Sequence, residues 1–296
     1  MIVAPPLEEL SGTEVKLSIR GLSKKFKGSA GEVVALSNVS LDVRAGEFLI
    51  LVGQSGCGKS TLLNIIGGLD SADSGSVLMD GRAVTLPGPD RAMVFQEGAL
   101  FPWLTAVKNV EFGLTQIRVP KHERRDRALH YLNIVGLSKF SDACIHELSG
   151  GMRQRVAIAR SLAVEPRVLL MDEPFSALDA QTREDLYIEL QRIWESTGAT
   201  ILFVTHNVRE AVTLGDRVVL LRRPAERGDS SIQSVFDVEI MRPRHIDDMD
   251  VARMAKQISL TMRHGHDKPE DLTRNEEQLD APSLLRGFDS ALDGRS

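Results

Sequence analysis

Short hydrophobic runs recur along the chain in two different patterns. In residues 15–22 and 33–43, apolar and polar positions partly alternate and β-branched residues are frequent, a pattern typical of antiparallel strands with one solvated face. Four other runs are almost entirely apolar, as parallel strands covered on both faces are; they are residues 48–52, 168–171, 200–204 and 217–221. The patterns predict a central, mostly parallel sheet and an antiparallel β-layer near the N-terminus.

Helical periodicity occupies the segments between the apolar runs. Three such segments alternate with the predicted strands of the central sheet, at residues 59–67, 151–163 and 180–195. This alternation is that of a doubly wound α/β fold. A longer stretch contains no comparable strand and shows further helical patterns at residues 105–114 and 123–135. We therefore expect a helical subdomain inserted into the sheet at about residues 98–163.

The two ends of the chain differ from this central unit. We assign residues 1–14 to an N-terminal tail, residues 15–241 to one α/β domain and residues 242–296 to a C-terminal extension. The extension is polar and charged, with one amphipathic helical pattern around residues 248–260, and we expect about the last thirty residues to be loosely ordered. The sequence contains no internal repeat, so it carries one such domain.

The composition of the chain limits its possible partners and its cellular compartment. Of the 296 residues, 42% are hydrophobic, which is enough to bury a large core. The formal net charge of −5 argues against a nucleic-acid partner, because phosphates require clustered Lys and Arg. We expect the two cysteines, Cys57 and Cys144, to be free thiols in a reducing compartment. Neither a signal peptide nor a membrane-spanning run is predicted, so any membrane contact should go through a partner.

A glycine-rich motif follows the first apolar run and opens the first helical segment. Its residues are Gly53, Gln54, Ser55, Gly56, Cys57, Gly58, Lys59, Ser60 and Thr61. This order is that of a phosphate loop (P-loop), in which backbone N–H groups and a helix N-terminus surround the phosphates of a nucleotide. We expect Lys59 to reach the β- and γ-phosphates of ATP and the Ser60 hydroxyl to ligate Mg²⁺. An ordinary glycine-rich turn is the alternative.

Two adjacent carboxylates end another predicted buried strand. Asp172 and Glu173 follow the apolar run at residues 168–171, and ligands of parallel sheets bind at the carboxyl ends of the strands. Asp172 is placed to hold magnesium through water, and Glu173 to polarise the attacking water as general base. The pair predicts hydrolysis rather than transfer of phosphate to a substrate. Its alternative is an acidic pair that is merely solvated.

A second loop suited to phosphate precedes another helical segment. Ser149, Gly150 and Gly151 lie in the sequence Leu-Ser-Gly-Gly-Met, where a serine and backbone amides at a helix N-terminus can bind an anion. One nucleotide cannot fill two such loops on opposite sides of a monomer. We infer that each loop completes the site of a second copy, with two ATP molecules enclosed in a homodimer. A plain helix cap is the alternative.

Together these motifs resemble the ABC ATPase family, in the family's order and across about residues 15–221. The resemblance implies a P-loop α/β ATPase that uses ATP and Mg²⁺. It implies that Gln96 touches magnesium or water and senses the transport partner, and that His206 contacts the γ-phosphate. Ser149 and Gly151 would bind the γ-phosphate held by the opposite protomer. Asp179, at the end of the stretch Ser-Ala-Leu-Asp, would link the two sites.

Two side chains of the predicted site have competing interpretations. Phe26 stands where the family stacks an aromatic ring on adenine, and such stacking contributes about 1 to 3 kcal/mol. A buried core Phe is the alternative. Cys57, inside the phosphate loop, is either a small tolerated side chain or a site of redox control.

Two local features narrow the resemblance to one group of importers. Residues 97–105, which include Phe101, Pro102 and Trp103, and the Met-Arg-Gln-Arg sequence at residues 152–155 resemble the nitrate, sulfonate and taurine importer ATPases. The aromatic residues would suit a groove for a short permease helix; packing inside the subdomain is the alternative. The resemblance implies a homodimer beneath two integral membrane permease subunits, served by a solute-binding protein, at the cytoplasmic face of the inner membrane.

Two other functional classes stay open. A soluble ABC ATPase could act on a macromolecular assembly without a permease, although such relatives generally carry two cassettes or a long coiled-coil insertion. A phosphate-loop kinase, or a nucleotide-binding scaffold without turnover, agrees less well with Asp172, Glu173 and His206. The transported solute is not encoded in this chain, because the binding protein and the permease select it.

Overall fold

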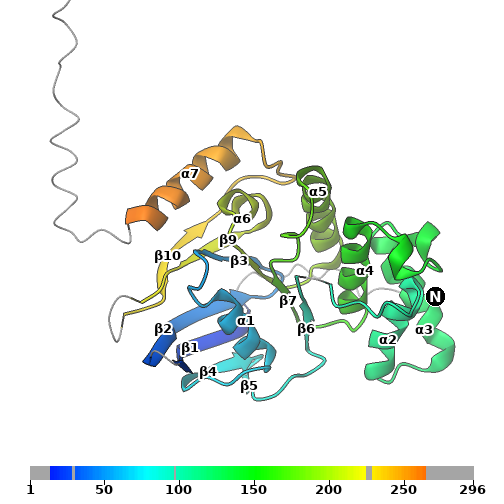
Figure 1. Ribbon diagram of the computed structural model, residues 1–296, viewed down its shortest axis with the longest axis horizontal. Coiled ribbons are helices and arrows are strands. Elements are labelled where there is room, and N and C mark those ends of the chain that lie inside the picture. The colour runs from blue at the N-terminus through cyan, green and yellow to red at the C-terminus, as the bar shows by residue number, and fades with distance from the viewer. Residues whose placement is uncertain (1–13, 29–30, 97, 225–228, 265–296) are drawn as a thin grey trace, which may run out of the picture.

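The computed structural model describes residues 14–28, 31–96, 98–224 and 229–264, and its strands form two sheets (Figure 1). The larger sheet has the strand order β10-β9-β3-β8-β7-β6. Its strands are β3 (Phe48–Gly53), β6 (Arg91–Val94), β7 (Val168–Asp172), β8 (Ile201–Thr205), β9 (Arg217–Leu221) and β10 (Ile232–Asp237). β10 runs antiparallel to β9, and all other neighbours are parallel. The predicted mostly parallel sheet is confirmed.

The central strands are apolar on both faces because both faces of the sheet are covered. Every residue of β3 is buried. Phe48, Ile50 and Val52 belong to one hydrophobic cluster, whereas Leu49 and Leu51 belong to the other. Successive side chains of a strand point to opposite faces, so each face of β3 contributes to a separate core. This is the physical reason for the continuous apolar runs in the sequence.

The smaller sheet confirms the predicted N-terminal β-layer and adds two strands to it. Its antiparallel order is β2-β1-β4-β5, with bounds β1 (Val15–Gly28), β2 (Gly31–Arg44), β4 (Ser74–Met79) and β5 (Arg82–Ala83). The sequence pattern missed β4 because its first three residues are exposed and only Val77 and Met79 are buried. Helix α1 (Lys59–Gly67) packs its apolar residues into the cluster that joins the two sheets.

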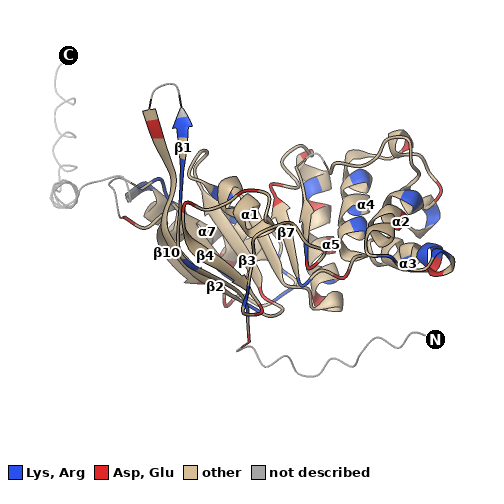
Figure 2. Cartoon of the chain, turned by 90° about the horizontal axis from the view of Figure 1, so that it is seen from below, with Lys and Arg blue, Asp and Glu red and all other residues tan. Residues whose placement is uncertain are grey.

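The predicted helical subdomain is inserted between β6 and β7. It contains α2 (Ala106–Gln116), α3 (Lys121–Ile134), α4 (Gly150–Leu162) and the short 3-10 helices η1 (Ser138–Phe140) and η2 (Ile145–Glu147). β6 and β7 are parallel neighbours, with Arg91 opposite Val168 and Val94 opposite Met171. The whole subdomain is therefore the crossover between two adjacent strands. Figure 2 shows Lys and Arg on α2, α3 and α4, with acidic residues beside them on α3.

Three helices lie against the larger sheet and on one another. They are α5 (Ala180–Thr197), α6 (Val208–Leu214) and α7 (Met249–His264). α7 confirms the predicted amphipathic helix and extends it; Val251, Ala255 and Ile258 are buried in the same cluster as the apolar residues of α6. The expectations for the N-terminal tail and for the last thirty residues concern residues 1–13 and 265–296, outside the described part of the chain. The division into domains stays a prediction.

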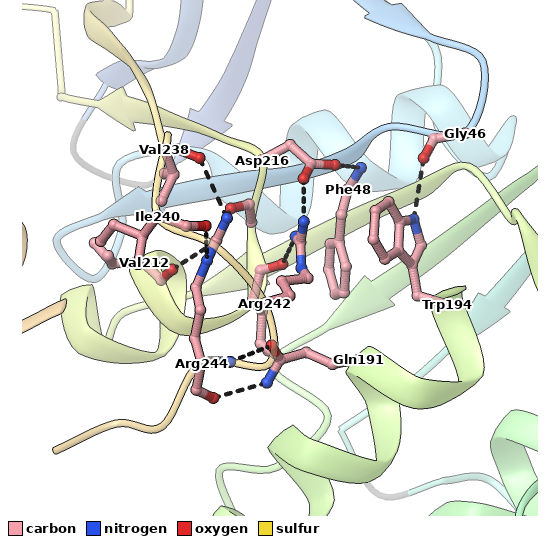
Figure 3. A network of polar contacts seen from close by, with 12 residues as sticks. Gly46, Phe48, Gln191, Trp194, Val212, Asp216, Val238, Ile240, Arg242 and Arg244 are labelled. Atoms are coloured by element: carbon pink, nitrogen blue, oxygen red, sulfur yellow. Dashed lines mark hydrogen bonds and ion pairs between the residues drawn. The ribbon is translucent and has the colours of Figure 1, made fainter. Parts of the chain in front are cut away.

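A buried arginine fixes the segment between β10 and α7 (Figure 3). Arg244 is 2% exposed, and its guanidinium donates to the carbonyl oxygens of Val212, Gly215, Val238 and Ile240. The side chain of Gln191 on α5 bonds both the N–H and the carbonyl of Arg244, each at 2.9 Å. Arg242 pairs with Asp216 and lies over the Trp194 ring at 4.2 Å. Burial lowers the pKa of Arg244 to about 10, so the group stays charged at neutral pH.

Candidate functional site

The predicted phosphate loop joins the end of β3 to the start of α1. Gly58 is the N-cap of α1, and its φ of +98° suits glycine. A Cβ there would lie 2.4 Å from the carbonyl oxygen of Ala35, so the close approach of β2 also requires glycine. No side chain caps the first turn of α1. Its N–H groups are therefore available to an anion, which the partial positive charge of the helix N-terminus favours.

Lys59 places a positive charge inside this loop. The side chain is only 6% exposed, and Nζ donates to the carbonyl oxygens of Gly53 at 2.9 Å and Gln54 at 3.2 Å. Nζ also lies 3.9 Å from Oε1 of Glu173. An ammonium group has three donors, so two bonds to the loop leave one donor for a ligand. The loop thus holds the cation at the position where the phosphate-loop motif requires it.

Ser60 and Asp172 bring two oxygen atoms together beside the loop. Ser60 Oγ donates to Asp172 Oδ1 at 3.1 Å. Burial raises the pKa of Asp172; the bond from Ser60 opposes this and the charge of Glu173 adds to it. Oxygen donors beside the predicted phosphate loop fit Mg²⁺, which keeps several waters and nucleotide oxygens in its coordination shell. The described residues contain no group of three or more His, Cys, Asp or Glu able to hold a metal, so these oxygens alone are an incomplete site.

Glu173 and His206 meet at the carboxyl ends of two adjacent strands. Asp172 pairs with Val204 in the parallel register of β7 and β8, so the residues that follow these strands are neighbours. His206 Nδ1 lies 2.8 Å from Glu173 Oε2. Glu173 has a φ of +43°, and its N–H donates to the carbonyl of Val204 at 3.0 Å. This strained conformation, uncommon outside glycine, is held by the surrounding chain and turns the carboxylate toward His206.

The Leu-Ser-Gly-Gly-Met loop and Asp179 lie elsewhere, against each other. Ser149 is the N-cap of α4 and accepts from the N–H of Met152 at 3.2 Å. Asp179 is the N-cap of α5 and accepts from the N–H of Thr182 at 3.0 Å. A Cβ at Gly151 would lie 2.6 Å from Thr182 Cγ2, so this close contact between α4 and α5 requires glycine. Within the described ranges, no hydrogen bond or ion pair joins Ser149 to the phosphate loop.

The structure separates the alternatives for Phe26 and Cys57 and shows where Gln96 lies. Phe26 is 44% exposed near the end of β1, with Lys24 Nζ 5.2 Å from its ring centroid, so the interpretation as a buried core Phe is wrong. Gln96 is exposed two residues beyond β6. Cys57 and Cys144 are free cysteines, as predicted. Cys57 is 3% exposed and burial raises its pKa, which disfavours the reactive thiolate.

An aromatic cluster lies on the helical subdomain, a few residues beyond Gln96 along the chain. The ring of Phe101 contacts those of Trp103 at 5.5 Å and Phe112 at 4.4 Å between centroids, and the guanidinium of Arg160 lies 5.7 Å from it. Trp103 is 76% exposed, so the interpretation as packing inside the subdomain is wrong for this residue. Sequence reasoning missed Phe112, which is 40% exposed on α2. Its spacing within an amphipathic helix gave no sign of the contact with Phe101.

Comparisons with known proteins agree on one family. The family model described as ABC transporter matches residues 36–176. The nitrate import ATP-binding protein NrtD of Synechocystis sp. is 54% identical over 209 residues, covering 70% of this chain and 79% of the relative. The taurine import ATP-binding protein TauB of Roseobacter denitrificans is 48% identical over 206 residues, covering 69% and 77% respectively.

A solved structure shares the fold. It is the dimeric, post-hydrolysis state of an ATP-binding cassette bound to ADP and Pi, 35% identical to this chain with a TM-score of 0.64. The match covers 76% of this chain and all of that one. None of the helices in the described ranges combines the length and the apolar character needed to cross a membrane.

Proposed function

The chain belongs to the ABC transporter ATP-binding proteins, and on this premise we propose that it powers the import of a small solute such as nitrate, a sulfonate or taurine. It is an ATPase of the ABC fold. Nitrate and taurine are the solutes of the two relatives named above. The observation that carries the catalytic proposal is the meeting of Lys59, Glu173 and His206 beside the phosphate loop.

Phe26 and the phosphate loop each have a proposed task in nucleotide binding. The ring of Phe26 stacks on adenine. The amides of the loop and Lys59 hold the β- and γ-phosphates, because backbone N–H groups at a helix N-terminus and a buried ammonium favour negative charge. The loop residues that surround the phosphates are Gly53, Gln54, Ser55, Gly56, Cys57, Gly58, Lys59, Ser60 and Thr61.

Hydrolysis is assigned to the pair at the strand ends. Glu173 accepts the proton of the attacking water, since a carboxylate held by one hydrogen bond keeps acceptor capacity for that water. His206 orients Glu173 through the 2.8 Å contact at Nδ1 and touches the γ-phosphate. Ser60, Asp172 and Gln96 would hold Mg²⁺, which when bound neutralises charge on the phosphate oxygens.

A homodimer completes the site in this proposal. Ser149, Gly150 and Gly151 stand at the start of α4, which Figure 1 shows separated from α1, the helix that follows the phosphate loop, by β6 and β7; they nevertheless form a helix N-terminus suited to phosphate. They would bind the γ-phosphate held by a second copy, and Asp179 would link the two sites. The dimeric state of the solved cassette supports this arrangement. Because ATP contacts both protomers only when the dimer is closed, it has the differential affinity that a conformational switch requires.

The proposed partners are two integral membrane permease subunits, served by a solute-binding protein. The exposed rings of Trp103 and Phe112 around Phe101 offer an apolar patch for a permease helix. Exposed aromatic residues are typical of protein interfaces. The assembly would place this chain peripherally at the cytoplasmic face of the inner membrane.

The catalytic assignment is tested by ATPase assays of the wild type and Glu173→Gln. Loss of a general base lowers kcat by about 100-fold to 10,000-fold, so we expect at least a 100-fold loss with ATP binding retained. Glu195→Gln, an exposed carboxylate on α5, serves as the matched control and should hydrolyse ATP normally. Normal turnover in Glu173→Gln would show that another residue is the base.

The importer assignment is tested on the intact complex. We expect the tagged chain to co-purify with its permease, and the complex in lipid vesicles to hydrolyse ATP faster when binding protein and solute are added. Nitrate, an alkyl sulfonate and taurine should be tried in parallel. ATPase activity in a chain that purifies without any permease, from membranes and cytosol alike, would favour a soluble ABC ATPase instead.

A further inference from the structure

We propose that Arg160 is a positioning residue that fixes the aromatic patch of Phe101, Trp103 and Phe112 to α4. A permease helix seated on the patch would then act on the start of α4, where Ser149 lies. This inference rests on the proposed dimer and on the proposed permease contact, and it adds a residue that the motifs do not contain. Contacts of Arg160 with the loop after Gln96, with the patch and with α2 support it.

The Arg160 guanidinium holds the loop that follows Gln96. Nη1 donates to the carbonyl oxygen of Ala99 at 2.9 Å, and Nη2 donates to that of Gly98 at 3.0 Å. Both residues have left-handed backbone angles, with a φ of +45° at Ala99 and +69° at Gly98. An alanine disfavours such a φ, so the loop needs partners to keep this shape. The planar guanidinium is suited to this task because it can donate to two neighbouring carbonyls at once.

Arg160 also contacts the patch itself. Its guanidinium carbon lies 5.7 Å from the centroid of the Phe101 ring, within the range of a cation–π attraction. From α2, the buried Asn109 side chain accepts from the N–H of Phe101 at 2.9 Å and donates to its carbonyl at 3.2 Å. Because the Phe101 ring contacts both exposed rings, the patch is attached to α2 through Asn109 and to α4 through Arg160.

The loop and α2 both approach α4 closely around Arg160. A Cβ at Gly98 would lie 3.3 Å from Gln154 Oε1 and 3.6 Å from Ala157 Cβ. A Cβ at Gly113 on α2 would lie 3.1 Å from the carbonyl oxygen of Arg160 and 3.5 Å from its Cγ. Arg160 is thus confined between α2 and the loop, so a displacement of either one is passed to α4.

Helix α4 carries such a displacement to the other end of the subdomain. It has 13 residues, which is about 20 Å at a rise of 1.5 Å per residue. Its middle is packed on all sides, since residues 156–159 are at most 1% exposed. A packed helix of this kind moves as a rigid element. Arg160 lies in its last turn and Ser149 caps its first turn, so the two ends of α4 face the two proposed partners.

The fluorescence of Trp103 tests the link without a permease. The chain has two tryptophans, so Trp194→Phe leaves Trp103, on the patch, as the only reporter. In this background we expect saturating ATP to change the Trp103 emission, because the nucleotide binds a second copy to the start of α4. Adding Arg160→Met removes both hydrogen bonds and the cation. It should reduce the ATP-induced change at least about fivefold and leave the ATP dissociation constant and the basal kcat within about twofold.

Arg124→Met is the matched control. Arg124 lies on α3 of the same subdomain, and its guanidinium also donates to a main-chain carbonyl, that of Val119 at 2.7 Å. Among the described residues, none of its hydrogen bonds or ring contacts reaches the patch, so this variant should keep the full response. Arg160→Lys retains the charge but not the fork of donors, and we expect it to lose more than about half of the response. If Arg160→Met does not fold, Arg160→Lys decides the question.

In the intact complex the same variants should separate stimulation from basal turnover. Lipid vesicles containing the permease are supplied with the binding protein and with nitrate, an alkyl sulfonate or taurine. We expect Arg160→Met to reduce the stimulation of ATPase activity at least about fivefold, whereas Arg124→Met keeps it. Full stimulation in Arg160→Met would show that the permease acts on the site by another route.

Other results would overturn the inference, alone or with its premises. A merely structural role predicts a lower unfolding temperature of Arg160→Met together with weaker ATP binding and a lower basal kcat. A response in both Arg160 variants equal to that of Arg124→Met would overturn the inference alone. The same holds if ATP leaves the Trp103 emission unchanged in a background protein that dimerises with ATP and hydrolyses it. A wild type that stays monomeric with ATP would overturn the proposed dimer as well, and one without ATPase activity the proposed catalytic role.

Discussion

Lys59 and Arg244 are both buried cations that donate to main-chain carbonyl oxygens. Lys59 keeps a donor available for a ligand, whereas Arg244 is enclosed by the protein. Lys59 bonds two carbonyls of its own loop, and the nearest carboxylate oxygen stands at 3.9 Å. Arg244 bonds four carbonyls from the end of α6 and from the segment after β10. A guanidinium has five N–H donors and an ammonium three. Both groups are therefore left with one donor.

The difference lies in what surrounds the remaining donor. Around Arg244 the chain closes from α5, α6 and β10, so the cation stabilises the fold (Figure 3). Around Lys59 the uncapped first turn of α1 supplies further N–H groups and no further acceptor. A buried cation next to unpaired donors needs an anion from outside, whereas one among carbonyls is already satisfied. Four variants test this distinction.

The largest effect is expected for Arg244→Met. The change leaves four carbonyl oxygens without their donor, and removal of a buried charged partner typically costs about 3 to 5 kcal/mol of the free energy of unfolding. Urea denaturation measures this loss. Arg253→Met, in an exposed ion pair on α7, is the control and should change stability by less than about 0.5 kcal/mol. If both variants lost the same free energy of unfolding, the Arg244 hydrogen bonds would contribute nothing to stability.

Lys59→Met should act on ligand binding rather than on folding. We expect ATP affinity to fall at least about 100-fold, near 3 kcal/mol, while the free energy of unfolding changes by less than about 1 kcal/mol. Calorimetric titration with ATP and urea denaturation give the two quantities. ATP in excess should stabilise wild type and Arg253→Met but not Lys59→Met. If Lys59→Met unfolded as readily as Arg244→Met, the proposal that Lys59 serves ligand binding rather than folding would be wrong.

Trp194→Phe probes the neighbour of Arg244 with a smaller change. The indole N–H of Trp194 donates to the carbonyl of Gly46 at 3.0 Å, and its ring lies under Arg242. Loss of one hydrogen bond and part of a cation–π contact should cost about 1 to 2 kcal/mol of unfolding free energy. Trp103→Phe is the matched control, since Trp103 is 76% exposed, and we expect no measurable change there.

Asp172→Asn should have the smallest effect, and of opposite sign. Burial raises the pKa of Asp172 in the folded chain, so the unfolded chain loses this proton first as the pH rises. Stability then decreases between the ordinary and the raised pKa, and the whole penalty stands at neutral pH. Without nucleotide, Asp172→Asn should gain less than about 1 kcal/mol at pH 7 and nothing at pH 3. A loss of stability at pH 7 would show that the bond from Ser60 outweighs burial.

Sequence patterns predicted those parts of the fold that depend on residues close together in the sequence. β3, β7, β8 and β9 have apolar residues on both faces, and the phosphate loop combines strand, glycines and helix start within nine residues. The pattern missed β6 and β10, because β6 has four residues and β10 is only partly buried. Their strand character comes from pairing with β7 and β9. Pairing partners cannot be read from a short window.

The candidate site divides in the same way. Motifs identified Lys59, Asp172 and Glu173 because their spacing follows from strand and helix geometry. Arg244 looks like an ordinary charged residue in the sequence, and partners 29 to 53 positions away help to explain its burial. The roles assigned to Ser149 and Gly151 depend on a second copy of the chain. They stay predictions until the dimer is tested.

The insertion of the helical subdomain between two neighbouring strands gives it one chain connection to the nucleotide edge of the sheet, besides the hydrophobic cluster that its helices share with the sheet. The chain leaves at the carboxyl end of β6, where Gln96 lies, and returns at the amino end of β7. There the N–H of Arg167 donates to the carbonyl of Asp90 at 2.8 Å, and this hydrogen bond joins the amino ends of the two strands. Any displacement of the subdomain would therefore be transmitted along the chain to Gln96. Asp172 and Glu173 lie at the end of the buried strand β7 and would stay in place. The Gln96 side of the candidate site would then move relative to the Asp172 and Glu173 side.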